Sequence, residues 1–292
     1  MSLVIEKKEK LDACERLVVE NNFQPIADIE RSIIKKYRKE LWTPFMKGIS
    51  DFDMIQNGDK IAVCISGGKD SLLLAKCMQQ LQKHSKVPFE VEYIAMNPGF
   101  NQINYDILTN SCKNIGIDVK VFDTEIFAVV DKIANNFPCY MCARMRRGSL
   151  YSYAQELGCN KIALGHHYDD FIETTMLNVL YAGNFKAMMP KLKATNFENM
   201  DLIRPLVYVR ESDIIDYTKH NGIQVMNCGC VVAAKKTSSK RREVKDLLKQ
   251  LRQHDSLIDK SIFASTTNVS TESIIGWTDS EGNHSFLDNY DN

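Results

Sequence analysis

Apolar residues near the start of the chain recur with the period of a helix. They stand four residues apart, at Ile33, Tyr37, Leu41 and Phe45. Lysines and arginines fill the positions between them, so one face of the predicted helix is apolar and the rest is charged. Pro44 marks a break or a new helix start, because proline fits only the first turn of a helix. We predict a helical segment over residues 1–56.

The pattern then changes to short apolar runs that alternate with longer amphipathic stretches. The runs predict strands at 60–66, 89–97, 119–124, 161–167 and 202–209. The stretches predict helices at 71–84, 145–158, 171–183 and 211–222. This alternation predicts an α/β fold with a doubly wound, mostly parallel sheet and right-handed crossovers. Ligands of such sheets bind beyond the carboxyl ends of the strands, so the loops that begin there are the candidates for function.

The last part of the chain differs in composition from this core, which we assign to residues 57–230. Residues 231–292 begin with the stretch VVAAKKTSSKRREVKDLLKQLRQH, which is predicted to contain a basic helix. The remainder is rich in Ser, Thr, Asn and Asp, with isolated apolar residues such as Trp277, and is predicted as an irregular tail.

Composition and charge narrow the class of protein. The 292 residues are 44% hydrophobic and 25% charged, which is typical of a soluble globular protein. The 37 basic residues balance 37 acidic ones, so any nucleic-acid surface must be a local patch. No apolar run has the length of a membrane span, and the charged N-terminus does not look like a secretory signal. We therefore expect no membrane association, a cytoplasmic location, and metal or catalytic roles for clustered cysteines among the nine.

The stretch SGGKDS, Ser66 to Ser71, follows the first predicted strand and opens a helix. Its two glycines let the backbone approach an anion, and the helix N-terminus supplies unpaired N–H groups. Lys69 can neutralise phosphate charge, and Asp70 suits a magnesium ion or a helix cap. The spacing matches neither a Walker A loop nor G-x-G-x-x-G. A phosphate-binding loop is favoured over a plain Gly-Gly turn with a capped helix.

A second polar stretch, GHHYDD, follows the fourth predicted strand. Gly165 closes the strand, and Asp169 and Asp170 stand at the start of the next helix. Asp170 suits a metal ion or catalysis, whereas Asp169 suits a helix cap equally well. His166 and His167 are either ligands and bases or structural histidines.

Cys139 and Cys142 form a CxxC pair, for which four interpretations are open. Paired with Cys228 and Cys230, they could hold a tetrahedral zinc ion. A thioredoxin-like redox pair fits poorly, because it opens the first helix of its own βαβ unit. The pair could also be packed without a chemical role, or it could bind an iron–sulfur cluster.

Four stretches of the sequence occur in an order and at separations typical of one family. They are DFDMIQNGDKIAVCISGGKDS, CYMCARMRRG, KIALGHHYDDFIETTMLNVLYAG and KLKATNFENMDLIRPLVYVRESDI. Over roughly residues 51–230 the chain resembles the tRNA 2-thiocytidine synthetase family of the PP-loop N-type ATP pyrophosphatases. The resemblance implies the PP-loop ATP pyrophosphatase fold, ATP as a cosubstrate and tRNA as a partner.

The resemblance also implies roles for single residues. ATP would be bound by Ser66, Gly67, Gly68, Lys69, Asp70, Ser71, Met96 and Gly165. Magnesium would be held by Asp70 and Asp170, and the catalytic residues would be Lys69, Asp70, Arg146 and Asp170. A [4Fe–4S] cluster would be held by Cys139, Cys142 and Cys228, although the NCGC stretch leaves Cys230 as the alternative third ligand.

The implied reaction is ATP-dependent tRNA thiolation. ATP adenylates the C2 oxygen of a pyrimidine, here a cytidine of the anticodon loop, and sulfur delivered by the cluster replaces that oxygen. The sulfur source would be a cysteine desulfurase or free sulfide, and a homodimer is expected. The arginines 144, 146 and 147 would stabilise the cluster, ATP phosphates or RNA phosphates, or else form a solvated helix face.

The sequence leaves two other functions open, and it does not single out the surface that would contact RNA. The chain could be another PP-loop adenylating enzyme, such as a lysidine synthetase or an amide-forming ligase, or a non-enzymatic ATP-binding iron–sulfur carrier or sensor. Three basic patches are candidates for RNA contact, each of which could equally be a solvated face. They are Lys35, Lys36, Arg38 and Lys39; Lys186, Lys191 and Lys193; and residues 235–242.

Overall fold

The computed structural model describes residues 23–126, 138–226 and 239–290, with only the backbone of residues 138–143, 239 and 289. These residues form two compact units. The first contains the described chain up to Asp170 and from Met189 to Ser239, and the second contains Phe171–Met188 and the chain from Lys240. In these ranges no helix is long and apolar enough to cross a lipid bilayer.

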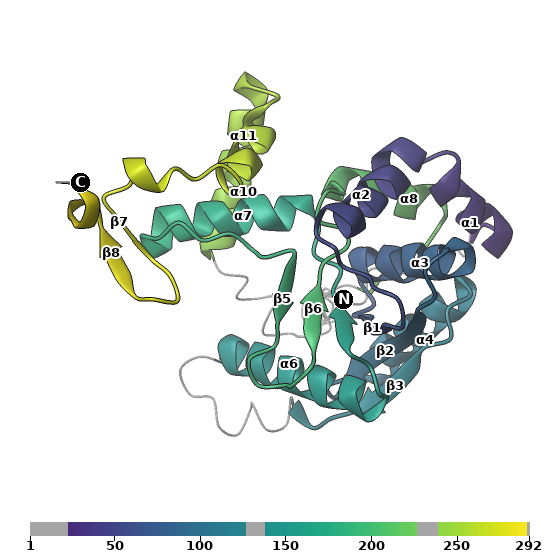
Figure 1. Cartoon of the computed structure of the whole chain (residues 1–292). Coiled ribbons are helices and arrows are strands. Elements are labelled where there is room, and N and C mark those ends of the chain that lie inside the picture. Colours follow the sequence, from purple (N-terminus) through teal and green to yellow (C-terminus); the bar gives the residue numbers. More distant parts are fainter. Residues whose placement is uncertain (1–22, 127–137, 227–238, 291–292) are drawn as a thin grey trace, which may run out of the picture. The chain divides into compact units, whose positions relative to one another are not determined.

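A six-stranded sheet forms the centre of the first unit (Figure 1). Its strands are β1 (Lys60–Cys64), β2 (Glu90–Asn97), β3 (Lys120–Asp123), β4 (Lys161–Ala163), β5 (Lys191–Lys193) and β6 (Asp201–Ile203). The spatial order is β3-β2-β1-β4-β6-β5, and all neighbours are parallel except β5 and β6. The chain order reverses between β1 and β4, which is where open α/β sheets bind their ligands. The predicted doubly wound, mostly parallel sheet is confirmed.

Helices cover both faces of this sheet because the strands are apolar on both sides. Alternation along β1 sends Ala62 and Cys64 to one face, where they pack with Tyr151 and Ala154 of helix α6 (Pro138–Glu156). Helix α3 (Lys69–His84) contacts β1 and β2, and α8 (Glu211–His220) contacts α3. The turn from β1 into α3 therefore lies at the carboxyl edge of the sheet.

The predicted N-terminal helix is broken into three pieces. They are α1 (Ile26–Ile34), a π-helical turn η1 (Arg38–Trp42) and α2 (Thr43–Asp51), and Pro44 is in the first turn of α2 as expected. Ile33, Leu41 and Phe45 are fully buried, so the apolar stripe is a core face. Residues 1–22 lie outside the described part of the chain.

Several other sequence predictions need correction, among them the strand predicted over 161–167, which ends at Ala163 in β4. Helix α4 (Gln102–Asn114) was not predicted, because its apolar positions are sparse. The helix after the CxxC pair begins at Pro138 rather than residue 145, since proline fits the first turn. The strand predicted over 202–209 ends at Ile203 in β6, and Leu206, Val207 and Val209 are buried in a turn instead.

The second unit is built on the basic helix α10 (Ser239–His254). It also contains most of α7 (Tyr168–Leu177), the π-helical turn η2 (Asn178–Ala182) and α11 (Ile258–Ser265). The tail that was predicted as irregular forms a hairpin of β7 (Gly276–Thr278) and β8 (Asn283–Ser285), with short 3-10 turns before and after it.

Basic residues of α10 are ion-paired within this unit. Arg241 Nε lies 2.8 Å from an oxygen of the buried Glu173, and Lys240 Nζ lies 3.1 Å from Glu243. Such pairing indicates that this part of the predicted basic patch stabilises the second unit.

Candidate active site at the ends of strands β1 and β4

The SGGKDS loop is held in shape by its own two serines. The Ser71 hydroxyl donates to the Gly68 carbonyl at 2.9 Å and accepts the Ser66 N–H at 3.1 Å. Gly67 has φ +81°, a backbone conformation that favours glycine. Helix α3 begins at Lys69, directly after this turn. The N–H groups of its first turn therefore lie at a fixed anion-binding loop, as the sequence predicts.

Gly165 lets the end of β4 come very close to this loop. A Cβ atom at this position would lie 3.0 Å from Asp70 C and Ser71 N, which are backbone atoms. Any side chain would therefore push the two chain segments apart. The glycine predicted to lie near the nucleotide is required for the contact between the two halves of the site.

A cavity of about 280 Å³ lies where these segments meet. Its lining comes from the ends of β1, β2 and β4 and from α3, α6 and α7: Cys64, Ile65, Ser66, Asp70, Ser71, Met96, Arg146, Leu150, Leu164, Gly165, His166 and Asp170. Seven of these residues were predicted as site residues, from four separate stretches of sequence. Gly67, Gly68 and Lys69 belong to the same loop but are not part of this lining.

Lys69 points to carboxylates rather than into the cavity. Its Nζ lies 3.0 Å from Glu211 Oε1 and 3.2 Å from Asp70 Oδ1. Burial lowers the pKa of Lys69, but the charges of Asp70 and Glu211 outweigh this and raise it above its ordinary value. The lysine is therefore charged and held at the mouth of the loop, as a phosphate-binding cation must be.

Asp70 is a carboxylate with an unsatisfied oxygen. Lys69 donates to Oδ2 at 3.3 Å, whereas Oδ1 is buried and has Lys69 Nζ only as an ion-pair neighbour, at 3.2 Å, with no hydrogen bond among the described residues. Burial raises the pKa of Asp70, the positive charges of His167 and Lys69 lower it, and the charge of Asp170 raises it further; the net shift is upward. A divalent cation would satisfy this oxygen, so the site fits magnesium.

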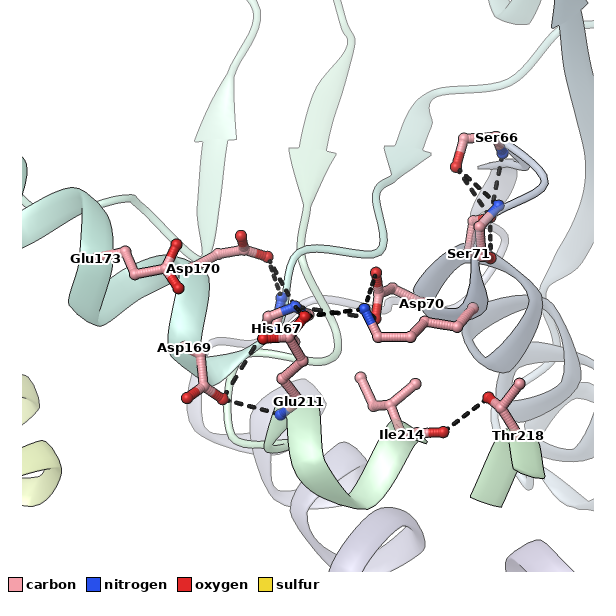
Figure 2. A network of polar contacts seen from close by, with 12 residues as sticks. Ser66, Asp70, Ser71, His167, Asp169, Asp170, Glu173, Glu211, Ile214 and Thr218 are labelled. Carbon is pink, nitrogen blue, oxygen red and sulfur yellow. Dashed lines mark hydrogen bonds and ion pairs between the residues drawn. The ribbon is translucent and has the colours of Figure 1, made fainter. Parts of the chain in front are cut away.

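Figure 2 shows how Asp70, His167, Asp169, Asp170 and Glu211 converge. The Nε2 atom of the buried His167 lies 3.4 Å from Asp170 Oδ2 and 3.8 Å from Asp70 Oδ1. The His167 ring therefore lies between the two carboxylates that the sequence assigns to magnesium. No group of three His, Cys, Asp or Glu side chains in the described ranges could hold a metal by itself. Mg²⁺ usually takes one or two carboxylates and completes its shell with phosphate oxygens and water.

The two aspartates of GHHYDD have different partners. Asp169 accepts the backbone N–H of Glu211 at 2.8 Å and so caps α8. Asp170 accepts the N–H of His167 at 3.0 Å and also lines the cavity. Asp169 therefore acts as a helix cap for α8. Asp170 both accepts a backbone N–H at the start of its own helix and lines the cavity.

Sequence reasoning missed Glu211 and Arg204. Glu211 is the first residue of α8, and Arg204 Nε lies 3.3 Å from His166 Nδ1. Both come from the segment after β6, whose carboxyl end meets the loop edge. The signal that could have identified Glu211 and Arg204 is their position after the carboxyl end of β6, because arginine and glutamate are by themselves common surface residues.

The CxxC pair lies in the first turns of α6. The backbone of this helix includes Cys139 and Cys142, and Arg146, four residues beyond Cys142, lines the cavity. Cys228 and Cys230 lie outside the described residues. The last residue described before them, Met226, donates its N–H to the Gly67 carbonyl at 2.8 Å. Met226, two positions before Cys228 in the sequence, is therefore hydrogen-bonded to the SGGKDS loop.

Comparisons with known proteins agree with this geometry. Residues 31–227 match the PP-loop domain family. The chain is 37% identical over 225 residues to the tRNA-cytidine(32) 2-sulfurtransferase of Citrifermentans bemidjiense, covering 76% of this chain and 88% of that protein. It is 39% identical over 242 residues to the enzyme of the same name from Shewanella denitrificans, covering 81% and 73%.

A solved structure has the same fold. The U34-tRNA thiolase NcsA from Methanococcus maripaludis, determined with its [4Fe–4S] cluster, matches with a TM-score of 0.60 over 80% of this chain and 81% of that one, at 23% identity. The family match and the identity to curated sulfurtransferases extend over most of the chain, and the loop, Gly165 and Asp170 meet at one cavity. The chain belongs to the PP-loop family of tRNA 2-thiocytidine synthetases, which are sulfurtransferases.

Proposed function

We propose that the protein is an ATP-dependent tRNA sulfurtransferase that replaces the C2 oxygen of a cytidine with sulfur. The observation that carries the proposal is the single cavity lined by the phosphate loop, by Asp170 and by Arg146. Arg146 is on the helix that bears the CxxC pair, so nucleotide and sulfur chemistry would meet there. The names of the relatives favour cytidine 32 of the anticodon loop as the target.

The C2 oxygen of a pyrimidine is a poor leaving group, so it must first be activated. Attack of this oxygen on the α-phosphate of ATP forms an adenylated base and releases pyrophosphate. The backbone N–H groups of the loop and the Lys69 ammonium would stabilise the phosphate charge that develops. Met96 and Gly165, beside the loop, would place the nucleotide in the cavity.

Magnesium would be held by Asp70 and Asp170. The unsatisfied Oδ1 of Asp70 and the place of Asp170 in the cavity lining support this assignment. When bound, the ion would neutralise the phosphates and the departing pyrophosphate. His167 would keep the two carboxylates in place from the other side.

Sulfur would enter through the cysteines. Cys139, Cys142 and Cys228, or Cys230 in place of Cys228, are the thiolates that would hold a [4Fe–4S] cluster, and thiolates suit such a cluster. When bound, the cluster would supply the sulfur that replaces the adenylated oxygen, and AMP would leave. Arg146 would face the reacting centre from the cavity wall. A desulfurase or free sulfide as the source, a homodimer and a cytoplasmic location stay predictions.

The decisive experiment measures two products of one reaction. Anaerobically purified protein is incubated with tRNA, ATP, Mg²⁺ and sulfide, and AMP and thionucleoside are quantified by mass spectrometry. We expect both products, and we expect Cys139→Ala to lose the thionucleoside while ATP binding is unchanged.

Other outcomes identify the alternatives. AMP without thionucleoside would indicate a lysidine synthetase or an amide-forming ligase. Iron and ATP binding without AMP formation would indicate a carrier or sensor, and zinc without iron would make the cysteines a structural site. Comparing the iron content of Cys228→Ala and Cys230→Ala identifies the third ligand.

A further inference from the structure

A second hollow, of about 600 Å³, lies along a neighbouring face of α6. We call it the α6 groove. It is lined by Arg144, Arg147, Gly148, Tyr151, Leu192, Lys193, Ala194, Thr195, Asn196, Phe197, Leu202 and Arg204. These residues come from α6, from β5 and the segment after it, and from the end of β6, all within the first unit.

The lining of the α6 groove is strongly positive. It contains three arginines and a lysine but no aspartate or glutamate. Arg144, Arg147 and Lys193 are exposed, and they have no ion pair with any residue that the structure describes. Surface cations are commonly balanced by nearby carboxylates, as Lys240 is by Glu243. Three exposed cations without an ion pair among the described residues, in a lining that also contains Arg204, favour a polyanionic ligand.

The groove is next to the nucleotide cavity along α6. Arg146 and Leu150 line the cavity, whereas Arg147 and Tyr151, one position further on, line the groove. Arg204 joins the two, because it lines the groove and its Nε contacts His166, which lines the cavity. A chain lying in the groove would therefore have a short path for one residue to reach the reacting site.

The floor of the groove is rigid. Tyr151 is buried and stacks on Phe197 with ring centroids 4.9 Å apart and planes at 15°. Burial and the neighbouring Arg147 lower the pKa of Arg204 to about 10, which leaves this arginine charged at neutral pH. Cations in the same lining as a stacked aromatic pair suit the alternation of phosphates with apolar sugar and base faces in RNA.

We propose that the α6 groove binds the sugar–phosphate backbone of the substrate tRNA beside the target base, so that the base enters the cavity between Arg146 and the phosphate loop. This inference rests on the proposed function. Arg144 and Lys193, at the exposed rim, contact phosphates, and Arg204 contacts the nucleotide next to the target. Target bases in RNA loops are typically splayed out of the helix, as entry into a cavity requires.

The test compares two variants that change charge to the same extent per residue. Arg144→Glu combined with Lys193→Glu reverses the rim of the groove. Lys86→Glu reverses an exposed lysine in the turn between α3 and β2, at the amino edge of the sheet. Fluorescence anisotropy with labelled tRNA measures affinity over a range of salt concentrations, and ATP binding is measured in parallel.

We expect the groove variant to bind tRNA at least about tenfold more weakly, with a salt dependence shallower by about one per lost phosphate contact. Its ATP affinity and the tRNA affinity of Lys86→Glu should match the unmodified protein. The milder Arg144→Ala and Lys193→Ala should each show a part of the effect, which separates lost contacts from misfolding.

Two results would overturn the inference while leaving the proposed function intact. They are groove variants that bind and thiolate tRNA as well as Lys86→Glu does, and polyglutamate that competes for the groove as well as RNA does. The latter would indicate an acidic protein partner instead. If the unmodified protein neither binds tRNA nor forms thionucleoside, the proposed function itself fails.

Discussion

The nucleotide cavity and the α6 groove lie side by side along one helix, yet their charges are organised in opposite ways. In the cavity region Lys69 lies between Asp70 and Glu211, and His167 lies between Asp70 and Asp170. The groove has four cations and no carboxylate in its lining. Positive charge is thus closely matched in one region and unmatched in the other.

The difference teaches what each region is suited to bind. Carboxylates beside a triphosphate would be repulsive unless a divalent cation joined the complex, so the cavity suits ATP together with magnesium. A polyanion that binds without a metal ion requires only cationic side chains, as in the lining of the α6 groove. If both proposals hold, phosphate groups are bound in two electrostatically different ways at two sites that share helix α6.

Of the changes that test this difference between the two regions, removing the Asp70 carboxylate should have the largest effect. We expect Asp70→Asn to lower tRNA-dependent AMP formation by about 10²–10³-fold, because a lost metal ligand leaves the phosphate charge unneutralised. The measurement is AMP and pyrophosphate release at saturating tRNA. Asp106→Asn, on the exposed face of α4, is the matched control, and equal rates for both variants would show that Asp70 holds no magnesium.

A methyl group at Gly165 should separate the two halves of the cavity. The added Cβ of Gly165→Ala meets the backbone of Asp70 and Ser71 at 3.0 Å, so we expect a loss of about 1–3 kcal/mol in stability and a loss of about tenfold in ATP affinity. Calorimetry and thermal unfolding measure both. Gly148→Ala, where a Cβ meets nothing within 4 Å, should keep ATP affinity, and if both variants behave alike the close contact is unimportant.

Removing a charge that balances Lys69 should have a smaller effect. Glu211→Gln leaves the lysine with one carboxylate fewer, so ATP without magnesium should bind about two- to fivefold more tightly. Titration calorimetry with and without Mg²⁺ checks this. Weaker binding would instead mean that Glu211 orients Lys69 for the phosphates.

The smallest expected effect is the change in melting temperature that Asp70→Asn causes at different pH values. The pKa of Asp70 is raised in the folded state, mainly by burial, so its contribution to stability is fully present below its ordinary pKa of 3.8 and is lost as pH rises through the raised value. Without magnesium, Asp70→Asn should therefore melt slightly above the unmodified protein at pH 7, and the difference should vanish in acid. Thermal scans at several pH values measure this, and Mg²⁺ should reduce the difference. A lower melting temperature for the variant at pH 7 would contradict it.

Much of the fold could be predicted because the buried strands carry continuous apolar runs. The existence of strands β1 to β4 follows from such local signals, and the start of α8 was also predicted correctly. Strand β5 is short and polar, and helix α4 has few apolar positions, so neither element was predicted from the sequence. Leu206, Val207 and Val209 are as apolar as a strand, but Pro205 and tertiary packing bury them in a turn.

The amino-acid sequence by itself determined the phosphate loop, the CxxC pair and the alternation of strands β1 to β4 with most of their helices, because these depend on neighbouring residues and on the period of each element. The tertiary structure decided that Asp169 caps α8, that Glu211 holds Lys69, and that Arg204 joins the cavity to the groove. These contacts join residues 38 to 142 positions apart. Their partners are chosen by strand order and by burial, which no local pattern encodes.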